Sequence, residues 1–307
     1  MSVYAYLIQR LQHAVLVVLG VSLIVFILMY LTGDPATLML PTDATAEQIE
    51  TFRRAMGFDR PIHEQYLTYL GRAVRGDLGL SLRHRQPAMS LVIERFPATI
   101  ELSVAAFVVA LGISVPLGII SAVKRGSLFD SLATVVAMVG ISVPIFWLGI
   151  VLILVVSVNW GLLPASGRGG IDNLVLPAIT LGMFMGPMIT RLLRSSLIDV
   201  LKQDYIRTAR SKGLAERVVI YKHALKNASL PVITVLGLQI GAMMGGSIIT
   251  ETVFAYPGMG LLAIQAIRNR DVPVVQAFVL VVALIILTAN LTVDLLYTYL
   301  DPRITYS

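Results

Sequence analysis

The chain has 307 residues, of which 56% are hydrophobic and only 14% charged, and its mean hydropathy is +0.81. A chain of this length with so little charge cannot cover a soluble globule and belongs in a bilayer. The absence of cysteine excludes disulfide bonds, thiolate metal sites and cysteine nucleophiles. The formal net charge of +6 would suit a nucleic-acid-binding protein, but the positions of the cations favour a membrane protein that binds no nucleic acid.

Six charge-free stretches are each about long enough to cross the roughly 30 Å hydrocarbon core as a helix. They cover residues 11–33, 102–123, 131–167, 173–190, 227–250 and 272–293. The third is long enough for a helix followed by an apolar loop, because turn residues recur from Asn159 to Gly167. The pair Pro257-Gly258 interrupts a seventh stretch, residues 252–267, where we expect an exposed loop with a half-helix. The sequence therefore predicts an all-α integral membrane protein with six transmembrane helices.

The distribution of lysine and arginine predicts the orientation of these helices. With the N-terminus inside, the inner segments hold thirteen Lys and Arg and the short outer loops hold three. All five lysines then lie inside, so both termini are expected in the cytoplasm. The first apolar run, Leu11 to Leu31, is longer than the h-region of a signal peptide, which spans about 7 to 15 residues, and we expect it to stay as a span.

Residues 34–97 are too polar to cross the membrane and lie outside in this orientation. Thr45 and Gln48 have the spacing of a helix capping box. Apolar residues at helical spacing follow and end at Gly76: Tyr66, Leu67, Tyr69, Leu70 and Val74. The chain is thus expected to divide into an N-terminal arm with the first helix (1–33), an extracytoplasmic helical insertion (34–97), and a five-helix core (98–303) that includes the cytoplasmic loop 199–227.

Three acidic residues lie at the ends of predicted spans, where headgroup water is expected to reach them: Glu101, Asp130 and Glu251. We interpret them as structural groups rather than as ligands for a substrate. The fifth span contains small residues that permit close helix contacts, and we interpret these as packing positions: Gly241, Gly245 and Gly246.

The most basic segment of the chain, residues 204–231, lies between the fourth and fifth spans. Its cations are Arg207, Arg210, Lys212, Arg217, Lys222 and Lys226. Apolar residues are interleaved with them at a spacing that suits two short amphipathic helices rather than a solvated coil. Gly213 falls between the halves and takes a positive φ without Cβ crowding, so we expect one helix to stop there and a second to begin. A basic loop lying on anionic lipid headgroups is the alternative interpretation.

The order of residues in this segment follows the pattern D-Y-hydrophobic-R-T-A-R-x-K-G, then H-x-x-K-N and a proline. The residues that fit it are Asp204, Tyr205, Arg207, Thr208, Ala209, Arg210, Lys212, Gly213, His223, Lys226, Asn227 and Pro231, and Leu214 follows the glycine. Three further motifs are G-D-P at 33–35, G-D-L-G-x-S at 76–81 and E-x-V-F-x-x-P-G-x-G at 251–260. Together they resemble the ABC importer permeases of the dipeptide, oligopeptide and nickel branch. Thr32 stands where a proline is more usual in that branch.

The resemblance implies the type I fold of ABC importer permeases and a place in the bacterial inner membrane. It implies that the chain forms half of a translocation pore with a homologous second permease, that two ATPases dock inside, and that a solute-binding protein delivers substrate outside. The residues that fit the basic pattern would couple the pore to the ATPases. The candidates for the outer mouth of the pore are Glu251, Phe254, Pro257, Gly258 and Gly260. The expected substrates are short peptides or related solutes such as glutathione or nickel chelates.

Sequence motifs for catalysis are missing. The four histidines are scattered, and no H-E-x-x-H, G-x-S-x-G or G-x-x-x-x-G-K-[ST] motif occurs. We therefore expect no catalytic, metal or cofactor site in this chain, with ATP and Mg on the partner ATPases. A stand-alone secondary transporter or channel is the alternative, although neither an internal repeat nor a charged residue at a span centre is recognisable. An intramembrane hydrolase would lack a nucleophile and its base.

The predicted orientation can be tested by labelling, because the chain has no native cysteine. A cysteine introduced at Ser81 is expected to react with an impermeant maleimide added outside intact cells. A cysteine introduced at Ser211 is expected to stay unlabelled. The opposite pattern would overturn the orientation.

Overall fold

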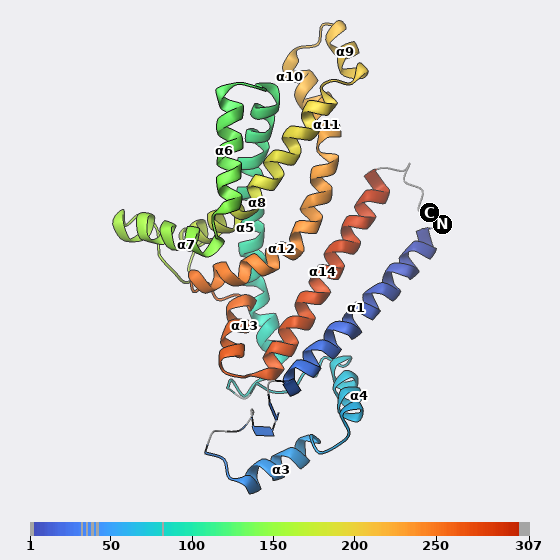
Figure 1. Ribbon diagram of the computed structural model, residues 1–307, viewed down its shortest axis with the longest axis vertical. Coiled ribbons are helices and arrows are strands. Elements are labelled where there is room, and N and C mark those ends of the chain that lie inside the picture. The colour runs from blue at the N-terminus through green and yellow to red at the C-terminus, as the bar shows by residue number, and fades with distance from the viewer. Residues whose placement is uncertain are drawn as a thin grey trace. The chain divides into compact units, whose positions relative to one another are not determined.

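The computed structural model of the protein describes residues 3–31, 33–34, 36–37, 40, 43–81 and 83–300. The described residues are almost entirely helical, with one isolated β-bridge between Leu80 and Pro87 (Figure 1). Their contacts form two compact units, one of Met1–Pro97 with Gly258–Ser307 and the other of Ala98–Pro257. The all-α class predicted from the sequence is thus confirmed.

The first unit combines two long apolar helices with the insertion that follows the first of them. Helix α1 (Val3–Leu31) packs along α14 (Val272–Leu300), and the short α13 (Met259–Arg268) also packs against α14. Helices α3 (Ala46–Met56) and α4 (Ile62–Ala73) form the insertion, and α4 contacts α1. The insertion is therefore helical, as predicted.

The predicted start of the insertion's first helix and the predicted apolar stripe both occur. Thr45 accepts a hydrogen bond from the backbone N–H of Gln48 at 3.3 Å, and the Gln48 side chain accepts one from the N–H of Thr45 at 2.9 Å. The rings of Tyr66 and Tyr69 in α4 lie 5.3 and 5.9 Å from the ring of Phe26 in α1. Aromatic contacts therefore attach the insertion to α1.

Helix α8 (Ile171–Val200) is central to the second unit, and thirteen of its residues are buried. Its most extensive packing is against α6 (Leu128–Ser142), α7 (Ile145–Leu152) and α12 (Leu230–Val253). Helix α5 (Ala88–Val123) belongs to this unit from residue 98 onward. It approaches α8 so closely that a Cβ at Gly182 would lie 2.8 Å from the carbonyl oxygen of Ala106.

The predicted packing role of the small residues in α12 holds at one position and not at another. A Cβ at Gly246 would lie 3.0 Å from Cδ1 of Leu181, whereas the space beside Gly245 is open. Gly246 therefore marks the close contact between α12 and α8.

Within the described residues, four helical segments are long and apolar enough to cross a membrane: Ile8–Ile27, Ala88–Val123, Ile171–Val200 and Val272–Val293. Two bent pairs bring the number to as many as six. The first pair joins Leu128–Gly140 to Ile145–Asn159 at 102°, and the second joins Leu230–Gly241 to Met243–Val253 at 54°. The six predicted spans thus correspond to four continuous helices and two bent ones.

The break in the third predicted span lies earlier than expected. The sequence predicts a helix and then a loop beginning near Asn159, but α6 already ends at Ser142 and Val143 is extended, with φ −82° and ψ 122°. The cause is Pro144, which disfavours the α conformation of the residue before it and starts α7. Helix α7 continues as the π-helical η1 (Ile153–Asn159), after which the predicted loop begins.

The expected loop at residues 252–267 is a half-helix, α13, preceded by a turn that is not exposed. Phe254 is 1% and Tyr256 0% exposed. The turn folds back on the end of α12, because the backbone N–H of Tyr256 donates to the carbonyl oxygen of Glu251 at 2.8 Å. The prediction of a half-helix is confirmed, and that of an exposed loop is wrong.

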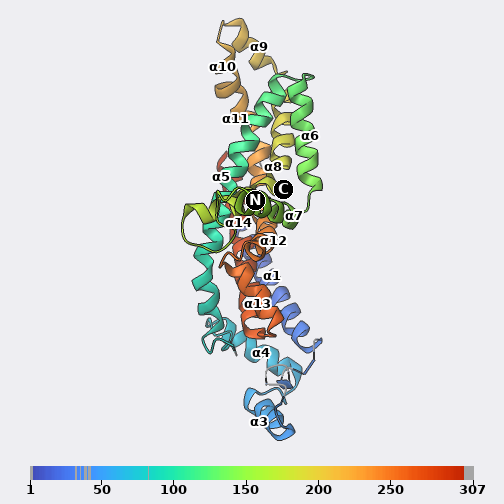
Figure 2. The same cartoon turned by 90° about the vertical axis from the view of Figure 1, so that its left-hand side faces the viewer.

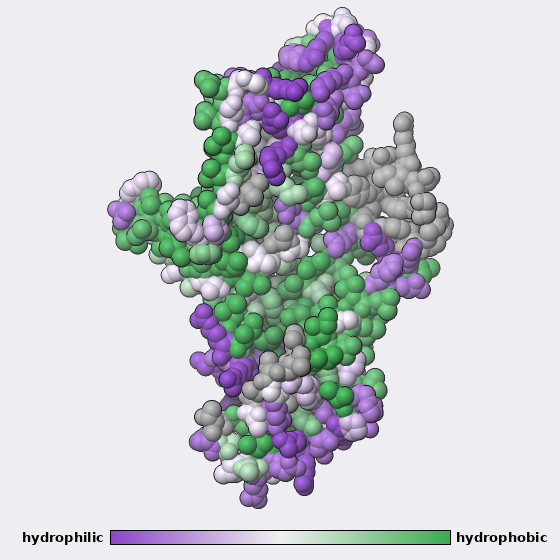
Figure 3. Space-filling view, in the orientation of Figure 1, coloured by the Kyte–Doolittle hydropathy of each residue, from purple (hydrophilic) through white to green (hydrophobic). Residues whose placement is uncertain are grey.

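Hydropathy distinguishes the ends of each unit from its helical body. In the second unit, the short helices α9 (Asp204–Ser211) and α10 (Glu216–Val218) form one end (Figure 2). Hydrophilic side chains gather at that end, and hydrophobic side chains cover α6 and α7 (Figure 3). In the first unit, hydrophilic side chains gather over α3 (Figure 3). These polar ends are where the sequence predicts water-exposed segments.

The position chosen from the sequence for outside labelling needs replacement. Ser81 is only 1% exposed, and its hydroxyl donates to the carboxylate of Asp271, so a cysteine there would be shielded. His63 is exposed near the start of α4. We expect His63→Cys to react with an impermeant maleimide added to intact cells and Ser211→Cys to react only after the membrane is opened. Labelling of Ser211→Cys alone in intact cells would contradict the orientation.

Candidate functional site

Residues 204–231, here named the basic tab, begin with the amphipathic helix α9. Ile206 is 0% and Ala209 8% exposed, whereas Arg207, Thr208 and Arg210 are exposed. The helix has 8 residues. The predicted separation of apolar and basic faces is therefore confirmed.

The turn that ends α9 has the predicted left-handed glycine. Gly213 has φ 73°, and its N–H donates to the carbonyl oxygen of Arg210 at 2.9 Å. The N–H of Leu214 reaches the carbonyl oxygen of Ala209 at 3.4 Å, which completes a glycine C-cap. A Cβ at Gly213 would meet nothing within 4 Å. A side chain there is therefore opposed by the backbone conformation alone.

The second half of the basic tab differs from the single short helix predicted. Helix α10 runs on through the π-helical η2 (Val219–Ala224) and α11 (Leu225–Ala228) toward α12. Its most buried residues are Val219, Ile220, Ala224 and Ala228. A π-helical turn contains more residues than an α-helical turn, so it changes which residues share a face of the helix. A search for the 3.6-residue period of an α-helix does not predict this change.

Two contacts hold the halves of the basic tab together. The Asn227 side chain donates to the hydroxyl of Tyr205 at 2.8 Å. Arg210 donates to both carboxylate oxygens of Glu216, at 3.1 and 2.6 Å. These hydrogen bonds hold the pKa of Glu216 below its ordinary value. Glu216 was not singled out in the sequence analysis, although it is the one acid between Tyr205 and Pro231.

Within the part of the chain that the structure describes, four cations of the basic tab form no ion pair: Lys212, Arg217, Lys222 and Lys226. Large apolar side chains are exposed beside them: Tyr205 40%, Leu214 40%, Val218 38% and Tyr221 56%. His223 is half-buried, and Asp204 pairs with Arg207 on the exposed side of α9 at 3.5 Å. A surface that combines free cations with exposed tyrosines and aliphatic side chains suits a protein partner.

The helix that leads into the basic tab is attached to α6 by a buried ion pair. Arg194 of α8 donates to both carboxylate oxygens of Asp130, at 2.6 and 2.8 Å. Asp130 is only 5% exposed and also accepts from Ser121 and from the N–H of Gly126. The expectation that water reaches Asp130 is therefore wrong, because protein donors surround it.

The residues proposed for the outer mouth of a pore are buried within this chain. Glu251 is 0% exposed and accepts a hydrogen bond from Thr99 at 2.7 Å, so headgroup water does not reach it either. The ring of Phe254 lies beside Gly149, where a Cβ would be 3.1 Å from Cε2, and its carbonyl oxygen accepts from Gly167 at 2.9 Å. These residues fasten the turn to the rest of the second unit.

The remaining candidates for the outer mouth fall on either side of the point in the sequence where the second unit ends, after Pro257. Pro257 is half-buried at the end of the second unit, while Gly258 and Gly260 are buried at the start of α13 in the first. Glu101 in the second unit accepts from Arg168 at 2.9 and 2.5 Å. Among the described residues, no three His, Asp or Glu are grouped so as to hold a metal ion.

Comparison of the sequence with those of known proteins places the chain in a family. A sequence model described as "Binding-protein-dependent transport system inner membrane component" matches residues 114–306, and one for the N-terminal part of such components matches residues 3–103. The dipeptide transport system permease protein DppB of Escherichia coli (strain K12) is 40% identical over 334 residues, covering 98% of each chain. The glutathione transport system permease protein GsiC of Escherichia coli O6:H1 is 42% identical over 302 residues, covering 98% of this chain and 99% of that one.

Solved structures show the same fold. The MetNI methionine ABC transporter in an inward-facing conformation matches with a TM-score of 0.59 at 17% identity, covering 69% of this chain and 97% of that chain. At this identity the likeness concerns the fold alone. The ABC importer permease fold expected from the sequence is confirmed.

The ion pair between α6 and α8 should contribute measurably to stability. Asp130→Ala leaves Arg194 without its partner and should lower the free energy of unfolding by roughly 2 kcal/mol, less than for a fully buried pair because the Arg194 side chain is 30% exposed. Thermal unfolding of the purified chain in detergent measures the effect. The control is Asp199→Ala, whose partner Lys202 lies 3.4 Å away on the surface; its effect should stay below about 1 kcal/mol. Equal effects of the two substitutions would contradict this account.

Proposed function

Because the chain belongs to the family of binding-protein-dependent transport system inner membrane components, we propose that it forms half of the translocation pore of an ATP-driven importer for short peptides. Family membership makes it a multi-pass transport subunit of the inner membrane. Relatives named for dipeptide and for glutathione transport match over nearly its whole length. These relatives support dipeptides or glutathione-like solutes as substrates. Longer peptides and nickel chelates belong to the proposed substrate class only through the sequence resemblance.

The proposed mechanism rests on the structure of the basic tab. Its two halves are joined by the Asn227–Tyr205 hydrogen bond and the Arg210–Glu216 ion pair. It therefore moves as one body, and α8 and α12 adjoin its two ends. In the proposed assembly, an ATPase docks on its free cations and exposed apolar side chains, and closure of the ATPase pair displaces the basic tab and these two helices together.

The proposed assembly contains this chain and a homologous second permease, two ATPases and a solute-binding protein. ATP and Mg bind to the ATPases, and the chain itself supplies no catalytic group. Both termini lie in the cytoplasm in this proposal; they fall outside the described residues. The proposed outer turn, from Glu251 to Gly260, acts by holding backbone in place, since Glu251 and Phe254 are buried.

The left-handed turn of the basic tab provides the test of coupling. Gly213→Val should cost about 1 to 2 kcal/mol, because a Cβ in the left-handed conformation comes too close to the carbonyl oxygen that follows it in the chain. This cost is too small to unfold the chain but large enough to tilt α9 against the second half of the basic tab. We expect uptake to fall sharply while ATP hydrolysis by the reconstituted complex continues. Uptake and ATPase activity are measured on the same preparation.

The matched control for this test is Gly161→Val. Gly161 also has a positive φ, 62°, and open space around it, but it lies in the loop after η1. Its substitution brings similar backbone strain and should leave coupling intact. Wild-type coupling in Gly213→Val would rule out the role of the turn. Active transport by the single chain without any ATPase would instead favour a stand-alone carrier and refute the importer.

A further inference from the structure

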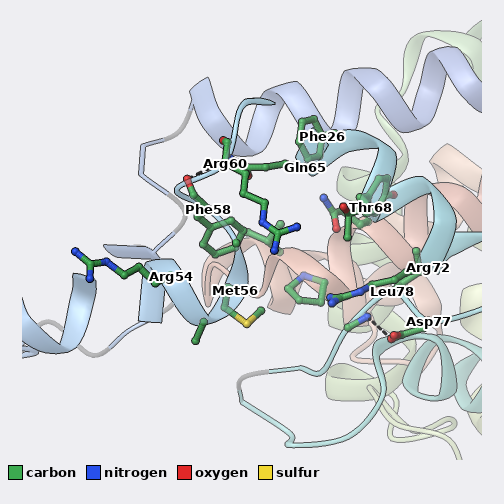
Figure 4. Close-up of a pocket in the computed structure, with 17 residues that line it drawn as sticks. Phe26, Arg54, Met56, Phe58, Arg60, Gln65, Thr68, Arg72, Asp77 and Leu78 are labelled. Carbon is green, nitrogen blue, oxygen red and sulfur yellow. Dashed lines mark hydrogen bonds between the residues drawn. The ribbon is translucent and has the colours of Figure 1, made fainter. Parts of the chain in front are cut away.

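The first unit contains a pocket of about 220 Å³ that the proposed coupling mechanism does not use (Figure 4). Its lining comes from α1, the end of α3, the turn between α3 and α4, α4 itself, residues 77–79 and the start of α14. Sites for drug-sized ligands measure about 300 to 1,000 Å³. The pocket therefore suits a group no larger than a single amino-acid residue.

Hydrogen bonds fix the turn that forms one wall. The side-chain amide of Gln65 donates to the carbonyl oxygens of Phe58 and Arg60 at 3.1 and 2.7 Å, and it accepts from the hydroxyl of Tyr30. Gly57 has φ 73°, and the Arg60 side chain passes 3.6 Å from the position of a Cβ there. This wall is consequently preformed.

Two arginines bring unbalanced positive charge into the pocket. Figure 4 shows Arg60 and Arg72 extending toward its middle, whereas Arg54, which pairs with Glu50 at 2.9 Å, points away. Neither Arg60 nor Arg72 forms an ion pair with any residue that the structure describes. Of the described lining residues only Asp77 is acidic, and it accepts from the N–H of Gly79 at 3.0 Å. The pocket is thus prepared for an anion.

Two neutral polar groups in the lining also have no partner. Gln276 is only 6% exposed, and its side-chain amide forms no hydrogen bond within the described ranges. The hydroxyl of Tyr69 is buried and equally without a partner there. Burial raises the pKa of Tyr69 to about 12, so the hydroxyl stays protonated and able to donate. Buried polar groups normally have hydrogen-bond partners, and the unpartnered hydroxyl of Tyr69 beside the free amide of Gln276 points to a polar ligand.

The rest of the lining is apolar. It includes Phe26, Met56, Phe58, Leu78 and Pro273, and Figure 4 shows Met56 and Phe58 on the same side of the pocket as Arg60. An inorganic anion would leave this surface uncovered. A ligand that joins an anionic group to an apolar body uses both halves of the lining.

We propose that this pocket binds a carboxylate carried on one apolar residue, such as the C-terminal residue of a short peptide. The guanidinium groups of Arg60 and Arg72 bind the carboxylate, and the amide of Gln276 and the hydroxyl of Tyr69 donate to it. The aromatic and aliphatic lining holds the side chain. The choice of a peptide rests on the proposed function, whereas the preference for a carboxylate rests on the pocket alone.

The test uses the full chain in nanodiscs of phosphatidylcholine, without partner subunits, and calorimetric titration with the dipeptide Ala-Phe. The matched ligand is Ala-Phe amide, which lacks only the carboxylate charge and should bind at least tenfold more weakly. Arg60→Gln and Arg72→Gln should each weaken binding of Ala-Phe about tenfold. The control is Arg75→Gln, an exposed arginine of the same unit outside the pocket, and should leave the affinity unchanged. Equal unfolding midpoints of all variants show that each is folded.

Three results would overturn the proposal: no binding of Ala-Phe, equal affinity for the acid and the amide, or wild-type affinity in both pocket variants. Loss of peptide binding when phosphatidylglycerol replaces phosphatidylcholine would identify a lipid headgroup site instead. Competition by inorganic phosphate at the concentration of the peptide would show an adventitious anion only. Because no ATPase is present, failure here leaves the coupling proposal standing, and loss of coupling in Gly213→Val leaves this one standing.

Discussion

No water reaches the interior of a lipid bilayer, so every polar group that a chain carries there needs a partner within the protein. This requirement accounts for the helical form of the spans and for the pairing of their acidic residues. Asp130 is surrounded by donors from α5, α8 and the α5–α6 turn, and Glu251 accepts from Thr99. Among the described residues, the basic tab and the insertion hold several cations that form no ion pair, such as Lys212 and Arg60.

The first half of the basic tab solves a different problem, because Ile206 and Ala209 are the two buried residues of α9. Fixing a backbone requires compensation for its lost conformational entropy. Here the Asn227–Tyr205 hydrogen bond and the Arg210–Glu216 ion pair close the segment on itself. A partner that meets the basic tab therefore meets a surface that is already ordered, which lowers the entropic cost of docking.

Local signals in the sequence predicted local structure well, but they did not predict contacts between residues far apart in the chain. The capping pair Thr45 and Gln48 and the left-handed Gly213 were predicted because each depends only on its own turn. The pairing of Asp130 with Arg194 joins residues 64 positions apart, and a single sequence contains no sign of it. The break at Pro144 was missed for another reason: the apolar run continues through it, so composition shows one span where the backbone turns by 102°.

The short connections at both ends of the basic tab have a mechanical consequence. Only residues 201–203 separate α8 from α9, and only Ser229 separates α11 from α12. A body fastened at one point pivots freely, but a body fastened at two points by such short connections transmits torque as well as force. Since α8 and α12 also pack against each other, a sideways load on the basic tab would twist this helix pair about its common axis.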